Sequence, residues 1–249
     1  MKLNFHTFIK KMIKNYFDMK FNSNFTLRTA IFAIVLIAVS QTATVNAQQS
    51  IGFGVHVNPL FGWFTSDNSD VTSKGASAGF NFGLTFNRYF WENYAFSAGI
   101  SLITAGGSLA YSDTTVYRLR TITEVLPGSK IKYEVKYLTF PIGMKLRSNQ
   151  IGYFSLFTDI GLDPKFALGG KLEIPSHNID KENANKELVR LSIGYHVTGG
   201  IEYSLGGNTS VNIGVNFDNN FTNIIKNNNN RPSAKILHKM FGLRLGLNF

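Results

Sequence analysis

Six charged or ionisable side chains are the residues best suited to chemistry, and each lies on the polar face of an expected strand. They are His56, Lys145, Asp159, His196, Glu202 and Arg244. Strands alternate their side chains between two faces, and each of the six lies on a face that also carries Gly, Ser, Thr or Asn. Because unpaired buried charge is costly, we expect Glu202 and Arg244 to join a set of ion pairs that closes an interior. The alternative is that these charges stay separate and hydrated near the rims.

The spacing of these residues does not suit catalysis. Ser192 and His196 share a face but lie four residues apart, which is about 13 Å along a strand and too far for a hydrogen bond. The sequence contains neither G-x-S-x-G nor H-E-x-x-H. His177 and His238 remain as candidates for a site at an external rim, which a lipid-modifying enzyme would require. We therefore predict a protein that is not an enzyme and has no catalytic residues.

Signals for metals and cofactors are also missing from the sequence. The chain has no Cys, which excludes Cys-ligated zinc and iron–sulfur sites. The segment 67–70, DNSD, lacks the Gly and the distal Glu of a calcium-binding EF-hand loop. The Gly pairs, such as Gly199-Gly200, do not form the phosphate-binding pattern G-x-G-x-x-G. The sequence predicts neither a metal nor a cofactor.

Residues 1–47 have the three parts of a secretory signal peptide. Basic residues precede an apolar run at 30–39, and the small residues Val45-Asn46-Ala47 follow. A run of ten residues is short of the roughly 20 that a membrane-spanning helix needs. We predict cleavage after Ala47, with Met19 as an alternative start that would give a signal of ordinary length. The mature domain would then be 48–249.

Charge argues against nucleic acid as a partner. The whole chain carries +10. Residues 1–47 hold five Lys, one Arg and one Asp, net +5, which leaves 10 − 5 = +5 for residues 48–249. No basic run or RNA-binding motif accompanies this mild excess. Lipid headgroups of the outer membrane, or lipopolysaccharide phosphates, are better partners for the surface lysines and arginines.

After Ala47 the chain shows eight segments of period-2 alternation, the pattern typical of strands. They are 51–63, 76–88, 93–106, 131–147, 151–163, 189–204, 209–219 and 236–249. Each reaches the roughly 9–11 residues that a tilted strand needs to cross a bilayer. In 131–147 the apolar parity changes between Tyr137 and Leu138, which predicts a β-bulge there.

The connections alternate between long and short. Long ones are expected at 64–75, 107–130, 164–188 and 220–235, and short ones at 89–92, 148–150 and 205–208. Short periplasmic turns and longer external loops are typical of outer-membrane barrels. The sequence thus predicts an all-β, eight-stranded antiparallel up-and-down transmembrane β-barrel in the outer membrane, with both termini in the periplasm.

The two faces of each strand predict how such a barrel would be filled. The apolar face, which includes Phe82, Ile213 and Leu245, would contact lipid, and the polar face would line the lumen. An interior of eight strands is just wide enough for side chains. The six polar residues named above would then form a network inside the lumen.

The segment 137–147, YLTFPIGMKLR, resembles the Y-L-x-x-P-hydrophobic-K segment of the PorT-like outer-membrane β-barrel family of Bacteroidetes-type bacteria. The segment 199–203 resembles the family's G-G-x-G-E-Y, although it is one residue shorter, and 219–224 resembles its G-L-x-N-I element. The family's G-P-Y is replaced here by Gly161-Leu-Asp-Pro164. The ending 242–249 looks like a terminal barrel strand.

The resemblance implies a location and a set of partners. Phe249 would be the final aromatic residue that the barrel-assembly machinery reads during insertion. The expected function is a structural or interaction role in the Gram-negative envelope, as an accessory of a protein-secretion or envelope-assembly complex, whose proteins would be further partners. The alternatives are a small-solute channel and an outer-membrane lipid-modifying enzyme.

Overall fold

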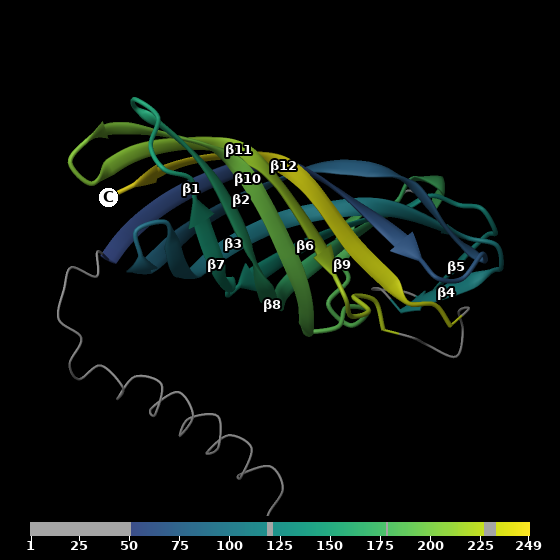
Figure 1. Ribbon diagram of the computed structural model, residues 1–249. Helices are drawn as coiled ribbons and strands as arrows, with labels where there is room; N and C mark the ends of the chain where they lie inside the picture. Colours follow the sequence, from purple (N-terminus) through teal and green to yellow (C-terminus); the bar gives the residue numbers. More distant parts are fainter. Residues whose placement is uncertain (1–50, 119–121, 178, 227–232) are drawn as a thin grey trace, which may run out of the picture. The chain divides into compact units, whose positions relative to one another are not determined.

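The structure is a computed structural model that describes residues 51–118, 122–177, 179–226 and 233–249 (Figure 1). The predicted signal peptide at 1–47, the start at Met19 and the cleavage after Ala47 lie outside these residues. None of the helices in the described part of the chain has the length and apolar content needed to cross a bilayer.

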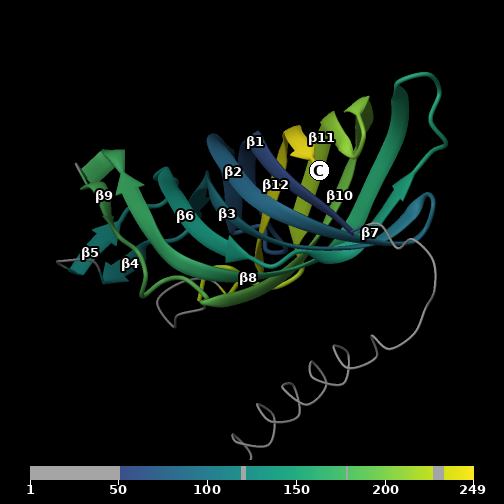
Figure 2. The same cartoon turned by 90° about the vertical axis from the view of Figure 1, so that its left-hand side faces the viewer.

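The described chain forms one ring of antiparallel strands (Figures 1 and 2). The ring consists of β1 (Ile51–Ser66), β2 (Val71–Trp91), β3 (Tyr94–Tyr111), β6 (Ile131–Thr139), β7 (Ile142–Arg147), β8 (Phe154–Ile174), β10 (Leu191–Gly206), β11 (Thr209–Asn220) and β12 (Ile236–Asn248). Both β6 and β7 pair with β3 and with β8, so they are two parts of a single interrupted strand. Pairing of β1 with β12 closes the ring, and the predicted eight-stranded barrel is confirmed.

Short elements occupy connections that the sequence predicted as loops. β4 (Thr115–Arg118) and β5 (Ile122–Val125) form a separate hairpin between β3 and β6. After β8 come a 3-10 turn, η1 (Pro175–His177), and β9 (Ile179–Asn183), which folds back and pairs with β8. The predicted loop at 164–188 is therefore wrong in its first part, because β8 continues to Ile174.

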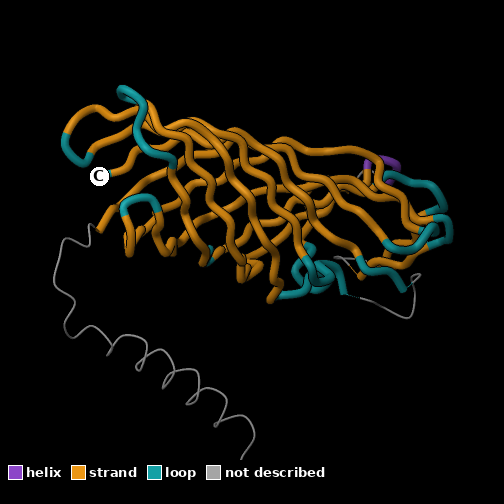
Figure 3. The backbone as a smooth tube through the Cα atoms, viewed as in Figure 1, coloured by secondary structure: helices purple, strands orange, loops and turns teal. Residues whose placement is uncertain are grey.

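The two ends of the ring differ in their connections, as Figure 3 shows in teal. The turns after β2, β7 and β10 are short and lie at the end that also holds the C-terminus. There the backbone N of Phe249 donates to the carbonyl of Phe53 at 2.7 Å, which joins the last strand to the first. The opposite end carries β4, β5 and β9 (Figure 2).

We call the part beyond Leu138 on this opposite side the distal half. It comprises 60–66 of β1, 71–79 of β2, 103–111 of β3, 131–137 of β6, 167–174 of β8 and 236–240 of β12, together with β4, β5, η1 and β9; the remainder is the proximal half. β2 and β8 each have 21 residues. At about 3.3 Å per residue and a tilt near 40°, 21 residues span about 50 Å along the barrel axis, roughly twice the apolar band of an outer-membrane barrel.

In the proximal half the outward side chains are apolar. Phe82, Ile213 and Leu245 are 47%, 58% and 42% exposed on the outer surface. The inward positions carry small or polar residues, such as Ser97, Thr198 and Asn212, all buried. The predicted orientation of the two faces is thus confirmed for this half.

In the distal half the two faces exchange character. Along β6 the inward residues Ile131, Tyr133, Val135 and Tyr137 are buried, while the outward residues include exposed Glu134 and Lys136. Such a pattern suits a wall with water outside and an apolar core inside. The distal half is built like a soluble β-protein on top of a membrane-type wall.

This exchange corrects the predicted bulge in 131–147. Alternation does not slip at Tyr137 and Leu138, since odd-numbered positions face inward on both sides of that point. A register shift does occur beside it, but in the partner strand: Lys136 pairs with Gly169 and Tyr137 with Ala167, so Leu168 is the extra residue. The apolar parity changed because the surroundings change, and not because the strand is distorted.

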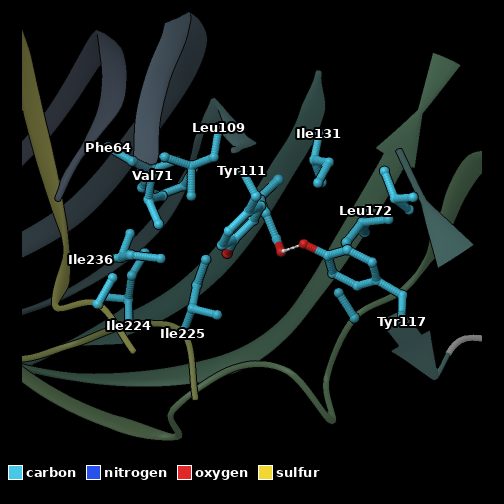
Figure 4. Packing of buried hydrophobic residues seen from close by; sticks show 14 of the residues in the cluster. Phe64, Val71, Leu109, Tyr111, Tyr117, Ile131, Leu172, Ile224, Ile225 and Ile236 are labelled. Atoms are coloured by element: carbon cyan, nitrogen blue, oxygen red, sulfur yellow. Dashed lines mark hydrogen bonds between the residues drawn. The ribbon is translucent and has the colours of Figure 1, made fainter. Parts of the chain in front are cut away.

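An apolar core fills the distal half (Figure 4). Tyr133 of β6 and Tyr117 of the β4–β5 hairpin are buried in it, and their hydroxyl oxygens lie 3.0 Å apart. Phe64 of β1 packs edge-on against Tyr133, and Leu172 of β8 and Ile236 of β12 complete the same cluster. A second cluster includes Leu60, Tyr137 and Met240. The β4–β5 hairpin therefore contributes to the core and is not a free loop.

Candidate functional site

The six residues predicted to form an interior network project from five strands into the proximal half. His56 lies on β1, Lys145 on β7, Asp159 on β8, His196 and Glu202 on β10, and Arg244 on β12. The first five are buried and Arg244 is half-buried. The alternation of each strand is what turns them inward.

Lys145 and Glu202 form a buried ion pair. The Lys145 Nζ lies 3.0 Å from Oε2 of Glu202. The other carboxylate oxygen of Glu202 accepts hydrogen bonds from the Ser210 hydroxyl at 2.6 Å and from the Asn248 amide at 3.1 Å. Lys145 also lies 5.3 Å from the ring centroid of Phe157, within the range of a cation–π contact.

A second group centres on His196. Its Nδ1 lies 2.8 Å from Oδ1 of Asp163, and its Nε2 lies 3.4 Å from Oδ1 of Asp159. Ser97 donates to the other oxygen of Asp159 at 3.4 Å. The imidazole therefore bridges two carboxylates of one strand, β8, that are four residues apart.

Arg244 is not the ion-pair partner of Glu202. Its guanidinium lies 3.4 Å from Nδ1 of His56, whereas the cation beside Glu202 is Lys145. The structure thus places all six predicted residues in one interior but distributes them over three contacts. Glu202 belongs to an ion pair with Lys145, whereas Arg244 contacts His56.

Sequence reasoning missed a third ion pair. The amine of Lys165 is fully buried, contacts the Asp218 carboxylate and donates to Oδ1 of Asn220 at 2.7 Å. Asn220 in turn donates to the hydroxyl of Ser192 at 3.4 Å. Lys165 was missed because the fifth strand was expected to end at 163. Continuing its alternation from Asp159 through Asp163 would have turned Lys165 inward.

These side chains leave little open space where the charged residues meet. The cavity between His56, Asp159, His196 and Arg244 measures about 30 Å³, which is room for about two water molecules. A separate polar cavity of about 200 Å³, lined by Glu202 and Asn248, lies at the end with the short turns. We call the packed charged layer, made of these ion pairs and Arg244, the plug.

The predicted absence of catalysis and of metals stays a prediction. Ser192 accepts a hydrogen bond from Asn220, and His196 is engaged with two carboxylates. His177 contacts its neighbour Ser176 at the surface, and His238 is buried beside Tyr137. Within the ranges given above, no three His, Asp or Glu side chains are grouped so as to hold a metal ion.

A family model described as "Outer membrane protein beta-barrel domain" matches residues 40–226. The chain belongs to this family. The match covers most of the barrel, and it makes the protein an outer-membrane β-barrel. None of the curated proteins matches the chain.

Several solved structures are similar to this barrel at low identity. Neisserial surface protein A has a TM-score of 0.43 and 12% identity, with 79% of this chain and 95% of that chain covered. Ail of Yersinia pestis, solved with a heparin analogue, has a TM-score of 0.40 and 13% identity, with 80% and 99% covered. The outer membrane protease OmpT of Escherichia coli has a TM-score of 0.42 and 12% identity, with 84% and 99% covered. The heparin analogue and the protease activity belong to those proteins.

Proposed function

We propose that this barrel has a structural and interaction role in the outer membrane, as an accessory of a protein-secretion or envelope-assembly complex. In this proposal residues 1–47 are the export signal, both termini are periplasmic and the distal half faces the outside. The PorT-like resemblance of 137–147 and 219–224 supports the choice of complex.

One observation carries the proposal: the barrel interior is filled at two successive levels. The plug closes the proximal half at the level of His196, where the space between its side chains is about 30 Å³. Above it, the apolar core around Tyr133 fills the distal half. Because the interior is filled, the outer wall and the projecting surface of the distal half are what the barrel offers to other molecules. Connecting segments held on a rigid scaffold are where binding residues are most often found.

The distal half supplies that surface. Its β4–β5 hairpin is anchored through buried Tyr117, and its β9 hairpin is anchored by pairing with β8. Ordered segments of this kind present fixed contacts, which lowers the entropic cost of binding a partner.

Footprinting of the complex tests the proposal. The tagged protein would be extracted from its own membranes in mild detergent, and hydroxyl-radical labelling of 112–130 and 175–190 would be compared before and after partners are removed. We expect co-purifying envelope proteins and protection confined to these distal segments. A tagged outer-membrane barrel of another family serves as the control. Recovery of the protein alone, or conductance well above background in planar bilayers, would contradict the proposal.

The lipid-modifying alternative has its own measurement. Deleting the gene would change the mass of lipid A if the protein were such an enzyme. We expect the lipid A mass spectrum to stay the same.

A further inference from the structure

A cleft on the outer surface of the distal half combines positive charge with a position at the edge of the apolar band. It measures about 230 Å³ and lies between β6, β8 and β9. Its walls carry Lys136, Lys171 and Lys181, with Glu134 as the acidic residue. We call this the basic cleft.

The excess of positive charge continues next to the cleft. A neighbouring cavity of about 100 Å³ shares Glu134, Lys171 and Lys181 with it and adds Lys132 and Glu173. Lys132 and Glu173 neutralise each other, since the amine lies 2.6 Å from the carboxylate. Glu134 lies opposite Lys171 in the register of β6 and β8. Three lysines against one carboxylate leave the lining of the cleft with an excess of positive charge, 3 − 1 = +2.

The floor of the basic cleft is open because a glycine lies there. Gly169 pairs with Lys136 beside the bulge at Leu168. A Cβ added at Gly169 would have Oδ1 of Asn185 at 3.4 Å as its near neighbour, so the space above it is free. A larger residue at 169 would occupy the cradle between the lysines.

Apolar side chains begin immediately on the proximal side of the cleft. Leu138 pairs with Phe166 one step along from Lys136, and Leu168 is 58% exposed on the same surface. Phe140 packs edge-on against Phe166 to extend this surface. A ligand that contacts both zones must therefore be amphipathic, with an anionic head and apolar chains.

We propose that the basic cleft binds the phosphate-bearing headgroup of an outer-leaflet glycolipid of the lipid A type. The phosphate lies between Lys136 and Lys181, and the acyl chains lie along Leu138, Phe166 and Leu168. Lysine binds phosphate as a point charge, and basic residues beside an apolar span recruit anionic lipids. The inference rests on the proposed orientation, in which the distal half faces outside.

Lipid binding by the isolated mature protein tests this inference without any partner. The protein would be reconstituted in phosphatidylcholine nanodiscs and titrated with bisphosphorylated lipid A, with dephosphorylated lipid A and with inorganic phosphate. Bound lipid would be counted by native mass spectrometry. We expect saturable binding of the phosphorylated lipid A, and binding at least about tenfold weaker for the dephosphorylated form.

Two kinds of variant separate the cleft from general surface charge. Lys136→Gln with Lys181→Gln is expected to weaken lipid A binding about tenfold or more, and Gly169→Leu to weaken it without changing the charge. The matched control, Lys74→Gln with Lys235→Gln, removes two exposed lysines elsewhere and should bind as the unmodified protein does. Heat-dependent mobility on gels verifies that each variant is folded.

The following outcomes would overturn the inference. They are unchanged binding in the folded Lys136/Lys181 variant, unchanged binding in Gly169→Leu, equal binding of dephosphorylated lipid A, or equally tight binding of inorganic phosphate. Loss of partner proteins in the footprinting experiment would instead affect the proposed function, since no partner is present in the nanodiscs.

Discussion

Lys145 and Glu202 form an ion pair that passes over a strand lying between them. Lys145 is on β7 and Glu202 on β10, and both strands pair with β8 rather than with each other. Their side chains are 6% and 4% exposed. The pair therefore ties together positions that the backbone ladder does not join directly.

Removing one partner of this pair should destabilise the barrel. Lys145→Met leaves the Glu202 carboxylate buried without its cation, which costs about 3–5 kcal/mol for a buried pair. The free energy of unfolding would be measured by denaturant titration in lipid. The double variant Lys145→Met with Glu202→Leu should recover most of the loss.

The pair between Lys132 and Glu173 is the matched control, because its side chains are 41% and 30% exposed. Lys132→Met should cost less than about 1 kcal/mol, as for other exposed pairs. Equal losses for Lys145→Met and Lys132→Met would contradict the prediction.

The same substitution should destabilise the barrel at one of two adjacent glycines on β10 and have little effect at the other. A Cβ at Gly200 would lie 2.3 Å from the carbonyl oxygen of Ile213, whereas one at Gly199 would have nothing within 4 Å. Gly200→Ala should therefore cost about 1–3 kcal/mol by overpacking, and Gly199→Ala should stay within about 0.5 kcal/mol. Unfolding titrations of the two variants measure the difference, and a reversed order would show that β10 faces the other way.

An arginine on the outer surface should cost more in the proximal half than in the distal half. Leu84 is 48% exposed within the outward apolar row of β2. Leu84→Arg should cost about 2–4 kcal/mol if this row lies at the middle of the bilayer. On the same strand Thr72 is exposed in the distal half, and Thr72→Arg should change the free energy of unfolding by less than about 0.5 kcal/mol. Equal losses of unfolding free energy for Leu84→Arg and Thr72→Arg would mean that both residues face the same medium, and would contradict the prediction.

The anchoring of the β4–β5 hairpin can be tested at Tyr117. Tyr117→Ala removes a fully buried ring from the distal core and should cost about 3–5 kcal/mol locally. Tyr117→Phe removes the hydroxyl that lies 3.0 Å from that of Tyr133 and should cost about 1 kcal/mol. Hydrogen exchange would be followed separately for 112–127 and for β10–β12. Faster exchange in β10–β12 as well would show that the two halves unfold together.

The fold could be predicted from the sequence wherever a strand had one solvent on its outer side. The segment 209–219 alternates cleanly, and the structure has a strand at Thr209–Asn220. The prediction failed in 131–147. The side chains there keep the same alternation, but the medium outside the strand changes from water to lipid. Period-2 counting assumes that the apolar face is always the same face, so it interpreted a change of solvent as a bulge.

The interior residues could be selected by parity, but their partners could not. Alternation placed His196 and Asp159 inward, yet contact between them depends on the stagger of β8 against β10, where Thr198 pairs with Asp159. The register between β8 and β10 is set by the closed ring, so it cannot be derived from the sequence of either strand alone. Lys165 was lost for a different reason, because Pro164 looked like the end of a strand, whereas it pairs with Ile193 inside the sheet.

The exchange of faces along β6 and β7 also sets how deeply the protein sits. Lys136 and Leu138 are successive outward residues of one wall, about 5 Å apart along the axis of a tilted barrel. If the protein lay deeper by that amount, the amine of Lys136 would enter the hydrocarbon core of the bilayer. If it lay higher by that amount, Leu138 would be exposed to water. Two successive outward residues thus mark the boundary between water and lipid on this wall. The height of the protein above the bilayer is therefore set by its own outer surface and does not depend on a partner protein.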